Sequence, residues 1–407
     1  MLRQTPFHPR TAALNGALSW KEWSGYAATC SFDRHSEREY FAVRHAVGLL
    51  DVTPLFKLDL TGPEAGAMLA RVFTRDISSI GVGRVVYGCL CDERGKVLDD
   101  GTVARLAPEH YRVTSSEPWL RWFRLHARGY DVQIEDSTHR IAALALQGPK
   151  AREVLKPIVE FDMDRMRFFR VRRTTLAGHP VWISRTGYTG DLGYEIWTAN
   201  EHALSVWDAL TEAGKPHWLQ PIGLDALDVT RIEAGFVLQG VDYVSARTCM
   251  IEARKSTPQE VGLGWTVDLE REPFIGQAAL LAEAETGPTW DLVGLELDWA
   301  GLEELYDSYQ LPPHLGPAAC RSTVPVYDTA GGQVGQVTSS TWSPVLKASL
   351  GLATLRKSHA AIGTTLRVEH TVEFGQRKVV EARVVERPFF DPERKRSTPA
   401  STKRTTP

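Results

Sequence analysis

The stretch "LFKLDLTGPEAGAMLARVF", residues 55–73, decides much of the fold. Its first half alternates apolar and polar residues, which predicts a strand, and a Gly-Pro pair beginning at Gly62 then opens a helix. The same order returns in "LALQGPKAREVL", residues 144–155, where Gly148 takes the place of Gly62. Two strand–Gly-Pro–helix segments predict two α+β subdomains built alike, and they suggest an old duplication.

The rest of the chain separates into a hairpin, a C-terminal run of strands and a tail. Residues 84–106 predict a hairpin whose turn is "DERGK". Beyond a break at residues 284–289, short strand patterns at regular spacing are typical of a barrel or jelly roll. We therefore expect an α+β region over residues 1–283 (two intertwined subdomains), a β-rich barrel domain over 290–390 and a disordered basic tail over 391–407.

Composition excludes several classes of protein. The chain has 407 residues and a formal net charge of −3, which gives no electrostatic case for a nucleic acid or an anionic membrane as partner. No apolar run approaches the ~20 residues that a membrane helix needs, and the first residues lack the apolar core of a signal peptide. Five cysteines are an odd and sparse set that fits a reducing cytoplasm, and none has the spacing of a metal site. We expect a cytoplasmic globular protein without a metal.

The stretch "RTGYTGDLGYEIW", residues 185–197, connects two strand patterns through a glycine-rich loop. Its glycines, at 187, 190 and 193, can take positive φ and let the backbone and Tyr188 close on a flat ligand. Glu195 points to the opposite strand face from Tyr194 and Ile196. A partly buried carboxylate there would suit the two parallel N–H groups of a 2-amino-4-oxo pterin, or an arginine. The alternative is an ordinary hairpin with a solvated glutamate.

Two further groups of polar residues have both a structural and a functional interpretation. In residues 223–236, Arg231 extends an apolar helix face, and it either pairs with Asp228 at i, i+3 or holds a ligand carboxylate. In "VLDDGTV", residues 97–103, Asp99 and Asp100 point to opposite faces of a strand. The inward carboxylate could stabilise positive charge during group transfer, or both could simply face solvent near the turn.

Taken together and in order, these segments resemble the T-protein family of the glycine cleavage system, the tetrahydrofolate-dependent aminomethyltransferases. The resemblance covers residues 36–390 and includes "LTGPEA", "VVYGCLCDERGKVLDD", "ALQGPKA", "SRTGYTGDLGYEI" and "GLDALDVTRIEAG". It implies an α+β fold of three domains, a cloverleaf around a central folate channel. Two of the domains are α+β subdomains, and the C-terminal one is a β-barrel or jelly-roll-like domain.

The resemblance also implies a cofactor and roles for five residues. Tetrahydrofolate is the implied cofactor, with Asp100 as the catalytic residue. Tyr87, Tyr188, Glu195 and Arg231 match the residues that contact the folate. The implied reaction needs neither a metal nor a protein nucleophile, and its implied partner is a small-molecule one-carbon donor.

Three departures from the family pattern bear on the donor. Pro54 stands where T-proteins have a histidine, Gly101 and Thr102 follow the aspartate pair, and Phe390 stands where a tyrosine is expected. Together they argue against the glycine-cleavage substrate, and the Asp-Asp-Gly sequence followed by an Arg-Leu strand is more similar to the folate domains of sarcosine- and dimethylglycine-oxidising enzymes and of folate-dependent demethylases. The expected function is therefore transfer of a one-carbon group from a small methylated or aminomethyl substrate onto tetrahydrofolate. The alternatives are a T-protein that acts on a lipoyl carrier protein and a non-catalytic folate-binding accessory protein.

Overall fold

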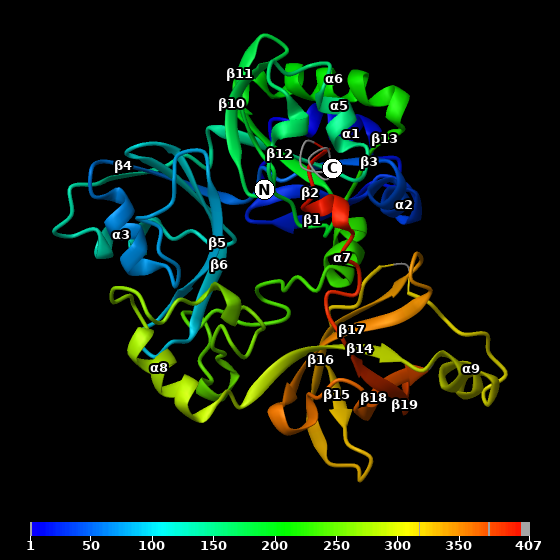
Figure 1. Cartoon of the computed structure of the whole chain (residues 1–407). Helices are drawn as coiled ribbons and strands as arrows, with labels where there is room; N and C mark the ends of the chain where they lie inside the picture. The colour runs from blue at the N-terminus through cyan, green and yellow to red at the C-terminus, as the bar shows by residue number, and fades with distance from the viewer. Residues whose placement is uncertain (1, 317, 373–374, 400–407) are drawn as a thin grey trace, which may run out of the picture. The chain divides into compact units, whose positions relative to one another are not determined.

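The computed structural model describes residues 2–316, 318–372 and 375–399, and the chain forms two compact units (Figure 1). Unit 1 consists of Met1–Gly88, Asp99–Thr230 and Asp391–Pro407. Unit 2 consists of Cys89–Leu98 and Arg231–Phe390. Among the residues described, no helix is long and apolar enough to cross a membrane.

A six-stranded sheet forms the centre of unit 1. Its strands are β3 (Val47–Asp51), β9 (Ile141–Gln147), β10 (Val171–Leu176), β11 (His179–Ser184), β12 (Gly193–Ala199) and β13 (Leu219–Pro221). They lie in the order β10-β11-β12-β9-β3-β13, and only the pairing of β13 with β3 is parallel. The helices of unit 1 include α1 (His8–Leu14), α2 (Glu37–His45), α3 (Ala65–Val72), α4 (Leu120–His126), α5 (Ala151–Leu155) and α6 (Ala203–Gly214).

A second sheet of five strands carries the predicted hairpin. Its strands are β4 (Phe56–Thr61), β5 (Val85–Cys91), β6 (Val97–Ala107), β7 (His110–Ser115) and β8 (Gln133–Asp136), in the order β5-β6-β7-β4-β8. The predicted turn lies between β5 and β6, which confirms that hairpin. A smaller two-stranded sheet pairs β1 (Ser19–Trp23) with β2 (Tyr26–Ser31).

The two Gly-Pro segments have the same geometry, one in each large sheet. Gly62, between β4 and α3, has a φ of 135°, and Gly148, between β9 and α5, has a φ of 129°. A Cβ atom would lie 2.4 Å from the carbonyl oxygen of Asp131 at the first position and 2.7 Å from that of Ala46 at the second. Because both the backbone angle and the space demand glycine, the predicted pair of α+β subdomains is confirmed at its two turns.

The six-stranded sheet is buried on both faces. On β9, Leu144 and Leu146 belong to one apolar core, whereas Ala143 and Ala145 belong to another. The first core includes residues of α5 and α6. The second core includes Val85, Ala104 and other residues of the five-stranded sheet. The two sheets of unit 1 therefore pack face to face, and polar residues on the inner faces lie between them.

Unit 2 is built around a closed β-barrel. Its strands are β14 (Trp290–Leu297), β15 (Val324–Tyr327), β16 (Gln333–Ser343), β17 (Ala348–Arg356), β18 (Thr365–Val372) and β19 (Gln376–Val385), and the barrel order is β14-β17-β16-β15-β18-β19. Helix α8 (Gln277–Thr286) ends just before β14, so the predicted break at residues 284–289 includes the last residues of this helix. Helix α9 (Trp299–Asp307), which the sequence analysis missed, begins where the Asp298 side chain accepts a hydrogen bond from the backbone N–H of Gly301 at 2.9 Å.

The C-terminal tail is ordered over the residues that the structure describes. Glu393–Lys395 forms a 3₁₀ helix, Lys395 is buried, and Arg394 pairs with Asp191 of the same unit. The expected disorder is therefore wrong for residues 391–399, because an ion pair with the buried Asp191 and the burial of Lys395 hold a segment whose composition alone predicts a solvated tail. Residues 400–407 lie outside the described residues.

Candidate active site

The two aspartates on β6 have different surroundings, as strand alternation predicts. Asp99 is fully buried, whereas Asp100 is half-buried. The Asp99 carboxylate accepts hydrogen bonds from Ser116 Oγ at 2.6 Å, Trp119 Nε1 at 2.7 Å and the backbone N–H of Glu117 at 3.1 Å. It also accepts one from the backbone N–H of Asp100 at 2.9 Å. Asp99 therefore fixes the backbone that carries its neighbour.

Burial, and after it the charge of Asp100, raises the pKa of Asp99 to about 7. The hydrogen bonds from Ser116, Trp119 and the Asp100 backbone act in the opposite direction but are outweighed. Asp99 therefore exchanges a proton near neutral pH, beside a second carboxyl group that is closer to solvent.

The structure brings together two of the residues predicted for the site. Tyr87 on β5 donates a hydrogen bond from its hydroxyl to Asp100 Oδ2 at 2.6 Å, and both residues are half-buried. This length is in the range of a charge-assisted O–H···O⁻ bond. The hydrogen bond holds one oxygen of Asp100 in place.

Glu195 lies on the inner face of the six-stranded sheet. On β12 it is opposite Ser184 of β11 and Ala145 of β9, and Ala145 belongs to the core between the two sheets. Part of the residue reaches solvent, but burial of its carboxyl group raises its pKa. Hydrogen bonds from Thr186 and the charge of Lys57 lower that pKa. Glu195 is thus a carboxylate in a confined setting, as the strand alternation predicted.

Lys57 was missed by the sequence analysis. It lies on β4 with 1% of its surface exposed, and its Nζ donates to the carbonyl oxygens of Thr53 at 2.9 Å and Leu55 at 2.7 Å. Burial lowers the pKa of Lys57 to about 7, although the charges of Asp51 and Glu195 raise it. In the sequence, a lysine at a polar position of an alternating strand is expected to face solvent. No local pattern therefore predicted that Lys57 is buried.

The glycine-rich loop closes on a glutamine side chain. A Cβ atom at Gly187 would lie 2.0 Å from Gln147 Oε1, and one at Gly193 would lie 2.2 Å from it. Gly190 has a φ of 73°, but Gly187 and Gly193 do not have positive φ. The prediction of positive φ is therefore wrong for Gly187 and Gly193. Glycine is needed at these positions because the Gln147 side chain occupies the space where a Cβ atom would lie. Tyr188 is half-buried in the same loop.

Arg231 is in unit 2, on α7 (Leu224–Glu233). It is 1% exposed, and its Nη1 donates to Asp242 Oδ2 at 2.5 Å and to Ser339 Oγ at 3.1 Å. The Asp242 carboxylate also accepts a hydrogen bond from Thr338 Oγ1 at 2.6 Å. Arg231 is thus part of a buried ionic network with Asp242, and its role as a ligand clamp stays a prediction.

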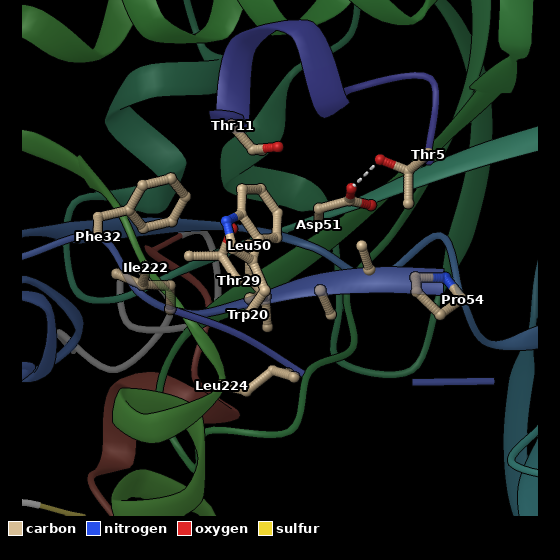
Figure 2. A pocket seen from close by; sticks show the side chains of 12 residues that line it. Thr5, Thr11, Trp20, Thr29, Phe32, Leu50, Asp51, Pro54, Ile222 and Leu224 are labelled. Atoms are coloured by element: carbon tan, nitrogen blue, oxygen red, sulfur yellow. Dashed lines mark hydrogen bonds between the residues drawn. The ribbon is translucent and has the colours of Figure 1, made fainter. Parts of the chain in front are cut away.

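A small cavity lies in unit 1 beside the loop that follows β3 (Figure 2). It has room for about one water molecule. In its wall, Thr5 Oγ1 donates to Asp51 Oδ2 at 2.5 Å, and Trp20 and Pro54 lie close by (Figure 2). Its lining includes Pro54 and none of the five residues predicted for the folate site.

Within the described part of the chain, no group of three or more His, Cys, Asp or Glu side chains is arranged to hold a metal ion. The side chains described above supply carboxylates, a phenol and a buried ammonium group. Such a set can accept N–H hydrogen bonds and stabilise positive charge.

Two family models match the chain. The GCVT N-terminal domain matches residues 7–271, and the glycine cleavage T-protein C-terminal barrel domain matches residues 310–391. The second match falls on the β-barrel of unit 2.

Relatives of known name are similar over nearly the whole chain. A trimethylamine-oxide aldolase of Ruegeria pomeroyi is 35% identical over 410 residues, which cover 97% of this chain and 48% of that protein. This chain thus spans about half the length of that relative. Aminomethyltransferases of Caldanaerobacter subterraneus (32% identical; 96% of each chain covered) and Bacillus cytotoxicus (33% identical; 96% of this chain and 98% of that one) match at full length.

A solved structure has the same fold. It is the glycine cleavage system aminomethyltransferase T from Bartonella henselae, with a TM-score of 0.81 and 23% identity. The match covers 96% of this chain and 99% of that one. The expected fold class, an α+β protein of several domains with a C-terminal β-barrel, is thereby confirmed.

Proposed function

The chain belongs to the glycine cleavage T-protein family of enzymes, and on this basis we propose that it transfers a one-carbon group from a small methylated or aminomethyl substrate onto tetrahydrofolate. The observation that carries the proposal is the arrangement at β5 and β6. There the hydrogen bond from Tyr87 holds Asp100, and the buried Asp99 fixes the Asp100 backbone.

The proposed site residues have the chemistry that a reduced folate requires. When bound, tetrahydrofolate supplies the ring nitrogen that accepts the one-carbon group. Glu195, which is acceptor-only when ionised, would hold the N–H groups of the pterin edge, and Tyr188 would pack against the ring. Arg231, whose Nη1 pairs with Asp242, is the remaining residue that we propose to contact the cofactor.

Asp100 would act on the charge of the reacting centre. Its carboxylate, held by Tyr87, is preorganised to stabilise the positive charge that develops on the amine during transfer. Asp99 takes up a proton near pH 7, and in this neutral form it does not repel the negative charge of the Asp100 carboxylate. The expected contribution of such positioning and electrostatics is several kcal/mol of barrier.

The class of donor rests on a similarity. The relative from Ruegeria pomeroyi is named for trimethylamine oxide, an N-methylated compound, and this favours a small methylated donor. A second candidate, transfer from a lipoyl carrier protein, is favoured by the relatives named aminomethyltransferase that match this chain over nearly their full length.

The test is a substrate panel with the purified protein. Tetrahydrofolate is incubated with methylated amines and amine oxides, sulfonium compounds, methoxy-aromatics and an aminomethyl-loaded lipoyl carrier protein. One-carbon-loaded folate is then measured by liquid chromatography and mass spectrometry. Product with a small methylated donor supports the proposal, whereas product with the carrier protein alone assigns the second candidate. Folate binding without product from any donor would favour a non-catalytic accessory role.

A further inference from the structure

The C-terminal residues 391–399 pack against the glycine-rich loop, in the same unit (Figure 1). Arg394 donates from Nε to Asp191 Oδ1 and from Nη2 to Asp191 Oδ2, each at 2.7 Å. The Asp191 side chain is fully buried, and Nη1 of Arg44 lies 3.7 Å from it. The same carboxylate accepts a hydrogen bond from the backbone N–H of Leu192 at 2.7 Å. A bidentate ion pair therefore ties the C-terminal segment to one end of the loop.

A second arginine ties the segment to the other end of the loop. Arg185 is fully buried, and its Nη1 donates to the carbonyl oxygen of Met166 at 2.8 Å. Its Nη2 lies within hydrogen-bond distance of three carbonyl oxygens of the segment, at 3.2 Å from Arg394, 3.1 Å from Lys395 and 2.7 Å from Ser397. These contacts hold the backbone of the segment, so they do not depend on its side chains.

The segment also has contacts that keep its own shape. Asp391 pairs with Lys395 at 3.0 Å and with Arg396 at 2.6 Å. Thr398 and Lys395 are buried. The segment is thus folded against unit 1, although its composition suggests a solvated tail.

Arg185 and Asp191 bracket residues 186–190, which include Tyr188. From inside the protein, the same loop is held by Gln147, whose Oε1 accepts a hydrogen bond from Thr189 Oγ1 at 2.9 Å. The Gln147 Nε2 also donates to the Thr186 carbonyl at 3.3 Å. The loop is therefore fixed on the core side by a glutamine and at both ends by the C-terminal segment.

We propose that residues 391–399 form a clamp that holds the glycine-rich loop in the conformation that binds the ligand, with Arg394 as the positioning residue. The part of this inference that concerns the ligand depends on the proposed function, since it takes Tyr188 as a contact of the folate. A loop that is ordered before binding loses less conformational entropy when the ligand arrives. Release of the clamp should therefore weaken ligand binding while the chemical step, which depends on Asp100, is retained.

The test compares three single variants of the full chain. Arg394→Ala removes the ion pair, and Arg394→Lys keeps the positive charge but loses the bidentate hydrogen bonding to Asp191. Arg10→Ala is the matched control. Arg10 makes the same bidentate contact with Asp208, at 2.7 Å for each bond, and its side chain is 41% exposed against 40% for Arg394. The Arg10 pair joins α1 to α6 and includes no residue of the glycine-rich loop.

Two readouts separate the clamp from the proposed function. The first is backbone amide exchange at Tyr188 and Gly190, which needs no ligand. We expect it to be at least about tenfold faster in Arg394→Ala and unchanged in Arg10→Ala. The second is the Kd for tetrahydrofolate from calorimetry, together with KM for tetrahydrofolate and kcat, both measured with the donor found in the panel. We expect Kd and KM for tetrahydrofolate to rise about tenfold with kcat within about twofold, and Arg394→Lys to recover part of the loss.

Unchanged exchange at Tyr188 and Gly190 in a folded Arg394→Ala protein would overturn the clamp. Faster exchange with an unchanged Kd would overturn its role in ligand binding. If Arg394→Ala does not fold, Arg394→Lys decides, since wild-type exchange and Kd in that variant contradict the proposal. A wild-type protein that does not bind tetrahydrofolate would refute the proposed function alone, because the amide exchange still decides whether the segment holds the loop.

Discussion

Asp99 and Asp100 are adjacent on one strand but have separate tasks. Asp99 accepts hydrogen bonds from residues that follow β7 and from Trp119, whereas Asp100 accepts one from Tyr87 on the neighbouring strand. Strand alternation alone predicts that one of the two carboxylates turns inward. It cannot predict the donors, because Ser116 and Trp119 reach Asp99 only after the sheet has formed.

Replacement of Asp100 by asparagine tests the charge. In Asp100→Asn the side chain keeps an oxygen for the Tyr87 hydroxyl but loses its negative charge. We expect folate affinity within about twofold of wild type and turnover lower by at least about tenfold, which corresponds to roughly 1.4 kcal/mol of barrier. Steady-state kinetics with the donor identified in the panel measure it.

The control for this prediction is Asp33→Asn, which makes the same chemical change at an exposed ion pair with Arg38. It should leave turnover unchanged. Turnover of Asp100→Asn equal to that of the control would remove Asp100 from the chemical step.

The raised pKa of Asp99 predicts a pH dependence of stability. Its pKa rises from 3.8 to about 7 on folding, so the folded protein keeps a proton that the unfolded chain releases. This contribution to stability is complete below about pH 4 and is lost as the pH rises to 7. Relative to Asp99→Asn, the wild-type free energy of unfolding should fall over that range, by on the order of 4 kcal/mol at most. Urea unfolding at pH 4, 5.5 and 7 measures the difference, and a constant difference would contradict the assignment.

Lys57 shows what sequence reasoning misses at a single residue. A lysine on alternate positions of β4 has the pattern of a solvent-facing residue, yet only 1% of it is exposed. It is buried because the inner faces of two sheets meet there, and its Nζ finds the carbonyl oxygens of Thr53 and Leu55. This packing joins segments far apart in the chain, so no local pattern could reveal it.

At the scale of elements, the sequence correctly predicted the glycine-rich loop, but positive φ does not explain two of its three glycines. The sequence predicted a loop between two strands, and β11 and β12 confirm those strands. The reason that two of its glycines are needed lies in Gln147 on β9, whose side chain fills the space beside Gly187 and Gly193. Such a contact between distant strands cannot be inferred from the spacing of glycines.

Gly193→Ala tests that explanation. The added Cβ would lie 2.2 Å from Gln147 Oε1, so the glutamine or β12 must shift. We expect a loss of about 1–3 kcal/mol in the free energy of unfolding, typical of overpacking. Chemical denaturation measures it, with Gly81→Ala as control, because a Cβ at Gly81 meets no atom within 4 Å and its φ is not positive. Equal free energies of unfolding for the two variants would mean that the Gln147 side chain moves aside without destabilising the protein.

The Gly-Pro turns are where sequence reasoning succeeded best. A φ near 130° and a carbonyl oxygen within 3 Å of the missing Cβ recur at Gly62 and Gly148, so the repeated signal in sequence has one physical cause. Helix α9, by contrast, interrupts a run of strands and was missed, although Asp298 is a standard N-cap residue.

At the scale of the whole molecule, the barrel and the α+β region follow from sequence, but the division into units does not. The hairpin tip Cys89–Leu98 groups with unit 2, and the C-terminal segment from Asp391 groups with unit 1. Compact units are set by contacts, and these contacts join segments that are distant along the chain. Continuous residue ranges, such as the predicted 1–283 and 290–390, do not describe units of this kind, and those domain ranges stay a prediction.

Ligand binding should change the stability of the whole protein, which provides the last prediction. A ligand that binds only the folded state stabilises it by about 2.7 kcal/mol at a hundredfold excess over Kd, and this would raise the Tm by about 3 °C. Tetrahydrofolate should produce that shift in the wild type, and Glu195→Ala should abolish most of it because the variant loses the proposed acceptor for the pterin N–H groups. Glu201→Ala, an exposed glutamate soon after β12, is the control and should keep the full shift. Scanning calorimetry with and without tetrahydrofolate measures all three proteins, and a full shift in Glu195→Ala would show that this carboxylate does not hold the cofactor.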